Sequence, residues 1–133
     1  ALLMIAVVVT GCQANSRQQI LAMDKSQVAL RSAQSRAFDT ADTALTVRTV
    51  IATLQDLGFT VDKVDQTLGL VSATKTENYT MKMTITARPR GDHQIIVRAS
   101  AQHNLNAVSD PVPYQQFFDS LSQSLFLEAH DVM

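Results

Sequence analysis

The sequence predicts a single α+β domain in which an antiparallel sheet carries two helices on one of its faces. Residues 79–88 alternate between apolar and polar side chains, which is typical of a half-buried antiparallel strand. Residues 41–57 and the segment that begins at Pro113 instead repeat apolar residues at helical spacing. Tight turns between the expected strands favour an antiparallel meander. Because both helices must bury an apolar stripe, they are expected to share the apolar face of the sheet.

The expected order of elements is β-α-β-β-β-β-α. The strands are expected at residues 36–38, 59–64, 68–75, 79–88 and 94–101, and the helices at 41–57 and 113–130. Asp39 or Thr40 can cap the first helix at its start, and Gly58 sits where its left-handed C-terminal cap belongs. Residues 89–92 have the composition of a hairpin turn, and residues 102–112 read as a loop.

The central strand separates a buried face from a solvent-exposed face. Its apolar side chains are expected in the core, and they are Tyr79, Met81, Met83, Ile85 and Ala87. The opposite face carries positive charges at Lys82, Arg88 and Arg98, with Thr84 and Thr86 between them. Such a face is usually only solvated, but it also suits an acidic partner or lipid headgroups. The three basic residues are therefore the predicted partner face, and Lys75 and Arg90 are further candidates for it.

The size and composition of the chain limit what the protein can be. Its 133 residues suit one domain, and 46% hydrophobic with 17% charged residues is ordinary for a globular fold. A net charge of -1 and an aromatic content of 5%, without tryptophan, argue against a general nucleic-acid binder. The single cysteine excludes an internal disulfide and a multi-cysteine zinc site.

The amino-terminal segment has the features of an export signal. Residues 1–10 read ALLMIAVVVT, which is too short to cross the hydrocarbon core, since crossing needs about 20 helical residues. The length suits the apolar region of a secretory signal. The chain begins at Ala1 without Met or a basic segment, so we expect the precursor to carry further residues. Residues 1–11 are assigned to a truncated signal peptide.

The signal ends in Val9-Thr10-Gly11-Cys12, which resembles the lipobox of bacterial lipoproteins. The resemblance implies cleavage before Cys12, a diacylglycerol on its thiol and, often, acylation of the new amine. Several acyl chains, palmitate among them, give stable anchoring. Gln13 follows, whereas aspartate at that position usually retains a lipoprotein in the inner membrane of enteric bacteria. The expected location is therefore the periplasmic side of the outer membrane.

Residues 12–34 are predicted to form the lipidated cysteine and a tether, and residues 35–133 the periplasmic domain. The tether is rich in Gln, Ser and Ala, and a flexible chain of its length spans roughly 25 Å. A broken apolar pattern leaves an alternative open, in which part of the tether is helical or lies against the domain or a partner. That pattern consists of Ile20, Leu21, Met23, Val28 and Leu30.

Two further resemblances concern the domain. With the lipobox, the element order resembles the helix-grip domains of the small lipoprotein subunit in the outer-membrane β-barrel assembly machinery, a likeness at the level of fold. The chain also resembles uncharacterised lipoproteins of Gram-negative bacteria in the segments RAFDT (36–40), VIATLQDLGF (50–59) and LVSATK (70–75). These resemblances imply an envelope lipoprotein but bring no catalytic or ligand-binding residues.

The sequence contains no recognisable catalytic motif. No serine lies in GxSxG, and no metal-binding pattern includes the histidines, which are His93, His103 and His130. Met81 and Met83 near a histidine could suggest a Cu(I) site, but methionines on an apolar strand face are typical core residues. Asp39 and Asp42 fit a helix start better than an acid–base pair. We expect no enzymatic activity, no cofactor and no metal.

Two functions fit these features. The first is an accessory or assembly interaction module that serves an outer-membrane machine or an export or efflux complex. Its partners would be the membrane, through Cys12, and an envelope protein that docks on the sheet face or a sheet edge. The alternative is a periplasmic binding module for a small apolar ligand or lipid, which needs a cavity above roughly 300 Å³. Small residues that could leave such room are Ala73, Ala87, Ala99 and Ala101.

Overall fold

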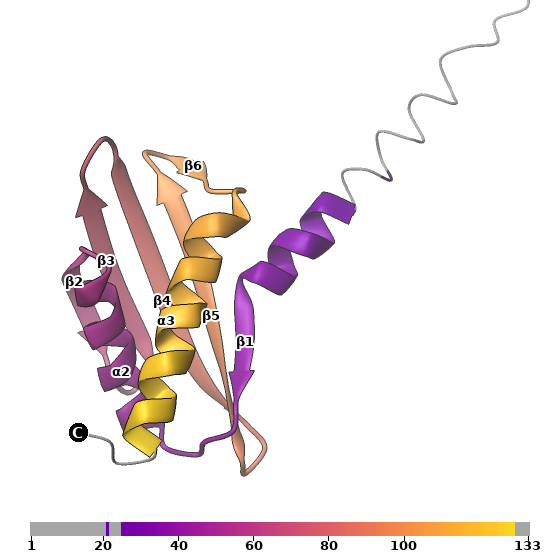
Figure 1. The fold of residues 1–133 in the computed structure, drawn as a ribbon, viewed down its shortest axis with the longest axis vertical. Coiled ribbons are helices and arrows are strands. Elements are labelled where there is room, and N and C mark those ends of the chain that lie inside the picture. The colour runs from indigo at the N-terminus through magenta and orange to yellow at the C-terminus, as the bar shows by residue number, and fades with distance from the viewer. Residues whose placement is uncertain (1–20, 22–24, 130–133) are drawn as a thin grey trace, which may run out of the picture.

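The computed structural model describes residue 21 and residues 25–129 (Figure 1). In chain order, the elements are β1 (Ser35–Phe38), α2 (Thr43–Asp56), β2 (Thr60–Asp65), β3 (Leu70–Thr76), β4 (Thr80–Arg90), β5 (Gln94–His103), β6 (Asn106–Ala107) and α3 (Pro111–Ala129). A short helix over residues 25–33 precedes β1 and is called the N-terminal helix below. The described part has the predicted order of elements, with this helix and β6 added.

All strand pairs in the sheet are antiparallel. The strand order is β1-β5-β4-β3-β2, and β6 also pairs with β5. The stretch from β2 to β5 is the predicted meander, and β1 pairs with β5 at the edge opposite β2. Figure 1 shows α2 and α3 next to each other on one face of the sheet. The predicted fold class, a two-layer α+β domain with two helices on one face, is confirmed.

The start of α2 differs from the prediction. Asp42 is the N-terminal cap, because its Oδ1 accepts a hydrogen bond from the amide of Leu45 at 2.9 Å. Neither of the expected caps plays this role: Asp39 accepts a hydrogen bond from the side chain of Gln94, and the hydroxyl of Thr40 accepts one from the amide of Asp42. The cap lies later in the chain because the chain must first cross from the sheet to the helix layer.

β4 continues through the predicted hairpin turn. Pro89 and Arg90 were expected in the turn, but both lie in β4 and pair with β5. Pro89 fits there because the pairing between β3 and β4 extends only to Thr86, so no strand on that side requires the missing N–H donor. The turn itself consists of residues 91–93.

Residues 102–112 are more ordered than the expected loop. They contain the end of β5, a turn and β6, which folds back onto β5. α3 begins at Pro111 rather than at Pro113, and the carboxylate of Asp110 accepts a hydrogen bond from the amide of Val112 at 3.0 Å. The first turn of α3 is thus held by a side chain that precedes the predicted start.

The core lies between the sheet and the two helices. Its buried members alternate along the strands and form one stripe on each helix; they are Val47, Val50, Leu54, Phe59, Val71, Ala73, Met81, Met83, Ile85, Ala87, Ile95, Val97, Ala99, Ala101, Tyr114, Phe117, Phe118, Leu121 and Leu125. Tyr79, which the alternation assigned to this face, is 50% exposed. It precedes β4, whose pairing with β3 begins at Thr80, so the alternation does not extend to it.

The end of the N-terminal helix contacts the domain. Leu30 and Ala33 are partly buried against the core. The carbonyl oxygen of Gln34 accepts a hydrogen bond from the amide of Ala99 at 2.7 Å. The described part of the tether is therefore helical and ends against the domain, as in the alternative that its apolar pattern allowed. The predicted signal peptide and lipidation site lie outside the described residues.

Candidate functional site on the open face of the sheet

The predicted partner residues come from the two central strands. Lys82 and Arg88 lie on β4, and Arg98 lies on β5. Successive strand residues point to opposite faces, and the strand neighbours of these three residues are buried on the helix side, except for the exposed Pro89; the buried ones are Met81, Met83, Ala87, Val97 and Ala99. All three side chains are exposed and lie on the face that carries no helix. The structure therefore brings the predicted residues onto one surface.

Two adjoining hollows follow this face. One, of about 520 Å³, is lined by Thr86, Arg88, Pro89, Arg90, Ile96 and Arg98. The other, of about 420 Å³, is lined by Arg31, Gln34, Ser35, Thr84, Thr86, Arg98, Ala99 and Ser100. Thr86 and Arg98 line both hollows, so the two are continuous. We call their combined surface the arginine groove. Lys82 lies on the same face but lines neither hollow.

Among the residues that the structure describes, the basic side chains of this face have no acidic partners. Within residues 25–129, ion pairs join Arg36 to Asp119 and Lys75 to Glu77, and neither pair includes a residue of the arginine groove. The guanidinium groups of the groove also donate no hydrogen bond to the described part of the chain. Neighbouring like charges repel one another, so an anion that neutralised them would be favoured on this face.

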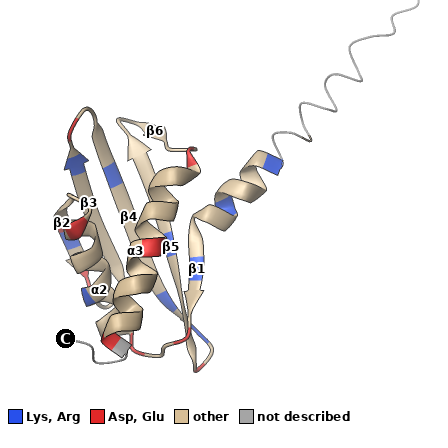
Figure 2. Cartoon of the chain, viewed as in Figure 1, with Lys and Arg blue, Asp and Glu red and all other residues tan. Residues whose placement is uncertain are grey.

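Charge is divided between the two layers of the domain (Figure 2). β4 and β5 contain no Asp or Glu, and their basic residues are Lys82, Arg88, Arg90 and Arg98. α3, in the other layer, contains Asp119 and Glu128 but no Lys or Arg. A net charge of -1 thus conceals a cationic sheet face, a property that composition alone does not reveal.

Two acidic residues lie on β2, at the edge of the open face. The carboxylate of Asp62 accepts a hydrogen bond from the hydroxyl of Thr74, and that of Asp65 accepts one from the amide of Leu68. Both carboxylates therefore have partners within the hairpin of β2 and β3. This leaves the basic side chains of β4 and β5 available to other anions.

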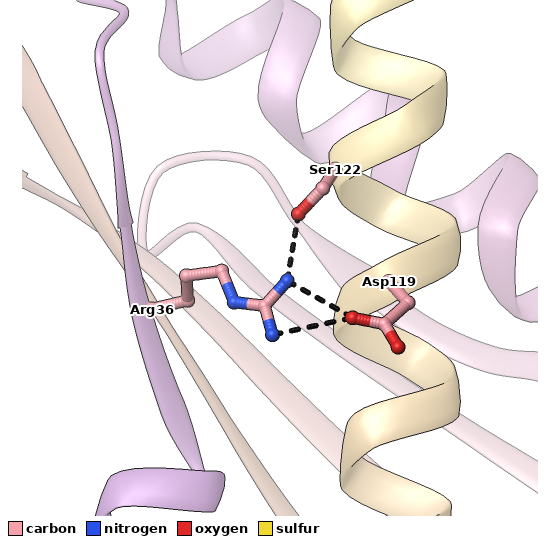
Figure 3. Close-up of polar contacts among 3 residues, drawn as sticks. All are labelled: Arg36, Asp119 and Ser122. Carbon is pink, nitrogen blue, oxygen red and sulfur yellow. Dashed lines mark hydrogen bonds and ion pairs between the residues drawn. The ribbon is translucent and has the colours of Figure 1, made fainter.

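Arg36 differs from the groove arginines because it points to the helix layer. Figure 3 shows its guanidinium between two side chains of α3: Nη1 donates to the Ser122 hydroxyl at 2.8 Å, and both terminal nitrogens lie 3.4 Å from Asp119 Oδ1. The guanidinium carbon also lies 5.4 Å from the centre of the Phe118 ring. Arg36 therefore links β1 to α3 and is not part of the open face.

The other candidate residues do not form a site. Met81 and Met83 are buried in the core, as predicted for that strand face. His93 is exposed in a turn, and the ring of His103 lies 4.4 Å from that of Tyr79, centre to centre. Within the described ranges, 21 and 25–129, no group of three or more His, Cys, Asp or Glu side chains could hold a metal ion. The predicted lipidation site, Cys12, and the third histidine, His130, lie outside those ranges.

A hollow between sheet and helices has a volume of about 160 Å³. It opens where α2 ends and α3 begins, and its apolar lining residues are Leu57, Phe59, Tyr79, Met81, Met83 and Pro113. This volume is below the roughly 300 Å³ of the smaller ligand pockets. The alanines that could have left room are fully packed with the aromatic residues of α3 in one core; they are Ala73, Ala87, Ala99 and Ala101.

The sheet edges suit docking less well than the open face does. β1 has only four residues. β2 has a shift of register between Val61 and Lys63, and the side chain of Lys63 is exposed. A bulge and an edge lysine both hinder the addition of another strand. The face, rather than an edge, is therefore the candidate docking surface.

In the part of the chain that the structure describes, no helix is both long and apolar enough to cross a membrane. None of the protein-family models compared with this chain matches it, and no curated protein is detectably similar to it. The functional argument therefore depends on the chain's own residues and on the geometry of the open face.

Proposed function

We propose that this chain is an outer-membrane lipoprotein that acts as an accessory or assembly interaction module of the cell envelope. Acyl chains on Cys12 would hold it on the periplasmic side of the membrane. The open face of the sheet would dock an anionic envelope component, with an outer-membrane machine or an export or efflux complex as the expected setting. The lipid anchor is inferred from the lipobox, and the docking face from the arrangement of charge.

The observation that carries the proposal is the cationic face formed by β4 and β5. Its basic residues lack partners within the described chain, whereas the carboxylates on the same face are already hydrogen-bonded. Complementary potentials speed encounter and fix orientation more than they raise affinity. A domain that must find one orientation on a partner fits this division of charge between its two layers.

Site-specific photocrosslinking in living cells tests the proposal. A photoreactive amino acid at Lys82 would report on the open face outside the arginine groove, and the matched control is Arg48, which is exposed on α2 in the other layer. We expect a discrete protein adduct from position 82 and none from position 48. The adduct should weaken when Arg88→Glu is added, because the attraction is electrostatic.

A second crosslinking position tests whether a missing adduct at Lys82 results only from the orientation of that side chain. Gln102 lies directly opposite Lys82 on β5 and is also exposed, so it samples the same surface. If positions 82 and 102 both give no adduct with the fully processed protein, the interaction function on this face is contradicted. Equal adducts from position 48 would mean that the contact is not specific to the face.

A further inference from the structure

We propose that the arginine groove binds the phosphate groups of anionic phospholipid headgroups, so that the part of the open face around this groove lies against the membrane. The inference deepens the proposed function and rests on its lipid anchor. It assigns the hollows around Arg31, Arg88, Arg90 and Arg98 to the lipid surface, and leaves the end of the face near Lys82 for a protein partner.

The chemistry of the groove suits phosphate. Three guanidinium groups, those of Arg88, Arg90 and Arg98, line one hollow. Each presents planar N–H donors that match two phosphate oxygens at once. The floor of the adjoining hollow adds the hydroxyls of Thr84, Thr86 and Ser100, which can donate to the remaining oxygens. A phosphate group would therefore supply the negative charge and the hydrogen-bond acceptors that the groove arginines lack in the described part of the chain.

The position of the groove favours a lipid surface over an acidic protein segment. Arg31 lines the groove and also belongs to the N-terminal helix, which is the part of the chain that leads to Cys12. Fewer than twenty residues separate Arg31 from Cys12, and a chain of that length spans roughly 25 Å even as a coil. An anchor at Cys12 would therefore hold the groove within reach of the headgroups.

The base of the N-terminal helix lies at the groove. Figure 1 shows that it leaves the domain beside the sheet rather than over α2 or α3. Its contact with the domain is fixed by the Gln34 carbonyl, which accepts a hydrogen bond from the Ala99 amide next to Arg98 on β5. The base of the tether and the rim of the groove are thus one structural unit.

Vesicle binding by the unlipidated, processed chain tests the inference. Cys12→Ser in the processed chain, residues 12–133, lacks both the acyl chains and the apolar signal peptide, so that any remaining affinity comes from the protein surface. We expect this chain to float with vesicles that contain 30% phosphatidylglycerol in phosphatidylcholine, and not with pure phosphatidylcholine. Each basic residue near an anionic surface contributes roughly a fivefold change in binding. The double variant Arg88→Gln/Arg98→Gln should therefore bind about 30-fold more weakly.

The single variant Arg98→Gln should bind about fivefold more weakly. Its matched control is Arg48→Gln, which removes one charge from the helix layer and should change binding less than twofold. All these side chains are exposed and have no ion pair among residues 25–129, so the variants are expected to fold. Circular dichroism of each variant checks this. Equal losses for Arg48→Gln and Arg98→Gln would overturn the proposal, because net charge alone would then explain the binding.

Two other outcomes separate the inference from the proposed function. If the unlipidated chain does not prefer anionic vesicles, and a photoreactive residue at Arg88 captures a protein in cells, the groove serves an acidic protein and the lipid assignment is wrong. If vesicle binding follows the expected pattern but wild-type Cys12 is never acylated, the anchor is contradicted while the groove keeps its assignment.

Discussion

The hydroxyl group of Tyr114 takes the place of a neighbouring strand beside Ala101. β1 pairs with β5 up to Arg98, and β6 pairs with it from Gln102 onward, so the Ala101 amide between them has no strand partner. That amide donates to the Tyr114 hydroxyl at 3.2 Å, and the hydroxyl donates to the carbonyl oxygen of Val108 at 2.7 Å. A buried side chain of α3 thus closes a gap in the edge of the sheet.

Removing this hydroxyl should destabilise the domain. Tyr114→Phe keeps the buried ring but leaves the Ala101 amide and the Gln34 side chain without their acceptor. An unsatisfied buried polar group costs about 1–3 kcal/mol, so the free energy of unfolding should fall by that amount in a urea titration. Tyr79→Phe is the matched control, because the Tyr79 ring is half-exposed, and it should change stability by less than about 0.5 kcal/mol. Equal effects of the two variants would show that the hydroxyl of Tyr114 is not stabilising.

Gly69 and Gly91 offer a comparison in which only the surroundings differ. Both have a left-handed φ, +65° and +66°, so alanine at either position costs about 1 kcal/mol of backbone strain. A Cβ at Gly91 meets no atom, whereas a Cβ at Gly69 collides with the carbonyl oxygen of Ala87. Gly69→Ala should therefore lower the unfolding free energy by about 1–3 kcal/mol more than Gly91→Ala does. Matching thermal denaturation curves for the two variants would contradict the close approach of Gly69 to β4.

The cap of α2 predicts a difference between two substitutions of one residue. Asp42→Ala removes the acceptor of the Leu45 amide and should cost about 1 kcal/mol of unfolding free energy. Asp42→Asn keeps an oxygen acceptor at the same place, so it should lose far less. Chemical denaturation of both variants measures the difference. A loss in Asp39→Ala that matches the loss in Asp42→Ala would mean that the cap is shared between them.

The lipid anchor makes the most exposed prediction. Cys12→Ser should leave the domain folded, because the domain begins more than twenty residues later, but it should abolish acylation. Acyl burial contributes about 0.8 kcal/mol per CH₂ group, so several acyl chains together stabilise membrane attachment by more than the arginine groove does. In cells labelled with radioactive palmitate, the variant should therefore carry no label and leave the membrane fraction after a high-salt wash, which weakens the electrostatic attraction of the groove. Unlabelled wild-type protein would refute the anchor, and a processed, membrane-bound variant would assign the attachment to another feature.

Much of the fold could be predicted because its pattern is local. The alternation along β4 and the stripes of α2 and α3 placed these elements correctly, since the side-chain period alone decides which residues share a face. Four details were wrong: the cap at Asp42, the length of β4 beyond Pro89, the start of α3 at Pro111 and the burial of Tyr79. Each depends on how an element meets its neighbours in space, which no local pattern reports.

The candidate site was predicted only in part. Lys82, Arg88 and Arg98 were identified because two strands of alternating sequence show their polar face. Arg31 was missed, because it lies in the predicted tether and reaches the face only through the contact of Gln34 with β5. Arg90, two positions from Arg88 on the same strand face, was a further candidate together with Lys75. Arg90 lines the groove, whereas Lys75 pairs with Glu77 and lines the hollow between the sheet and the helices.

The sequence by itself determined the fold class and the sign of charge on the sheet face, because both follow from periods of two and 3.6 residues, which act over a few neighbours. The export signal and the lipidation at Cys12 stay predictions that rest on the resemblance to a lipobox. Only the tertiary structure decided that Arg31 joins Arg88, Arg90 and Arg98 in one groove, and that Tyr114 replaces a strand beside Ala101. Both arrangements join segments far apart in the chain, and such contacts form only when the helices and the sheet bury their common core.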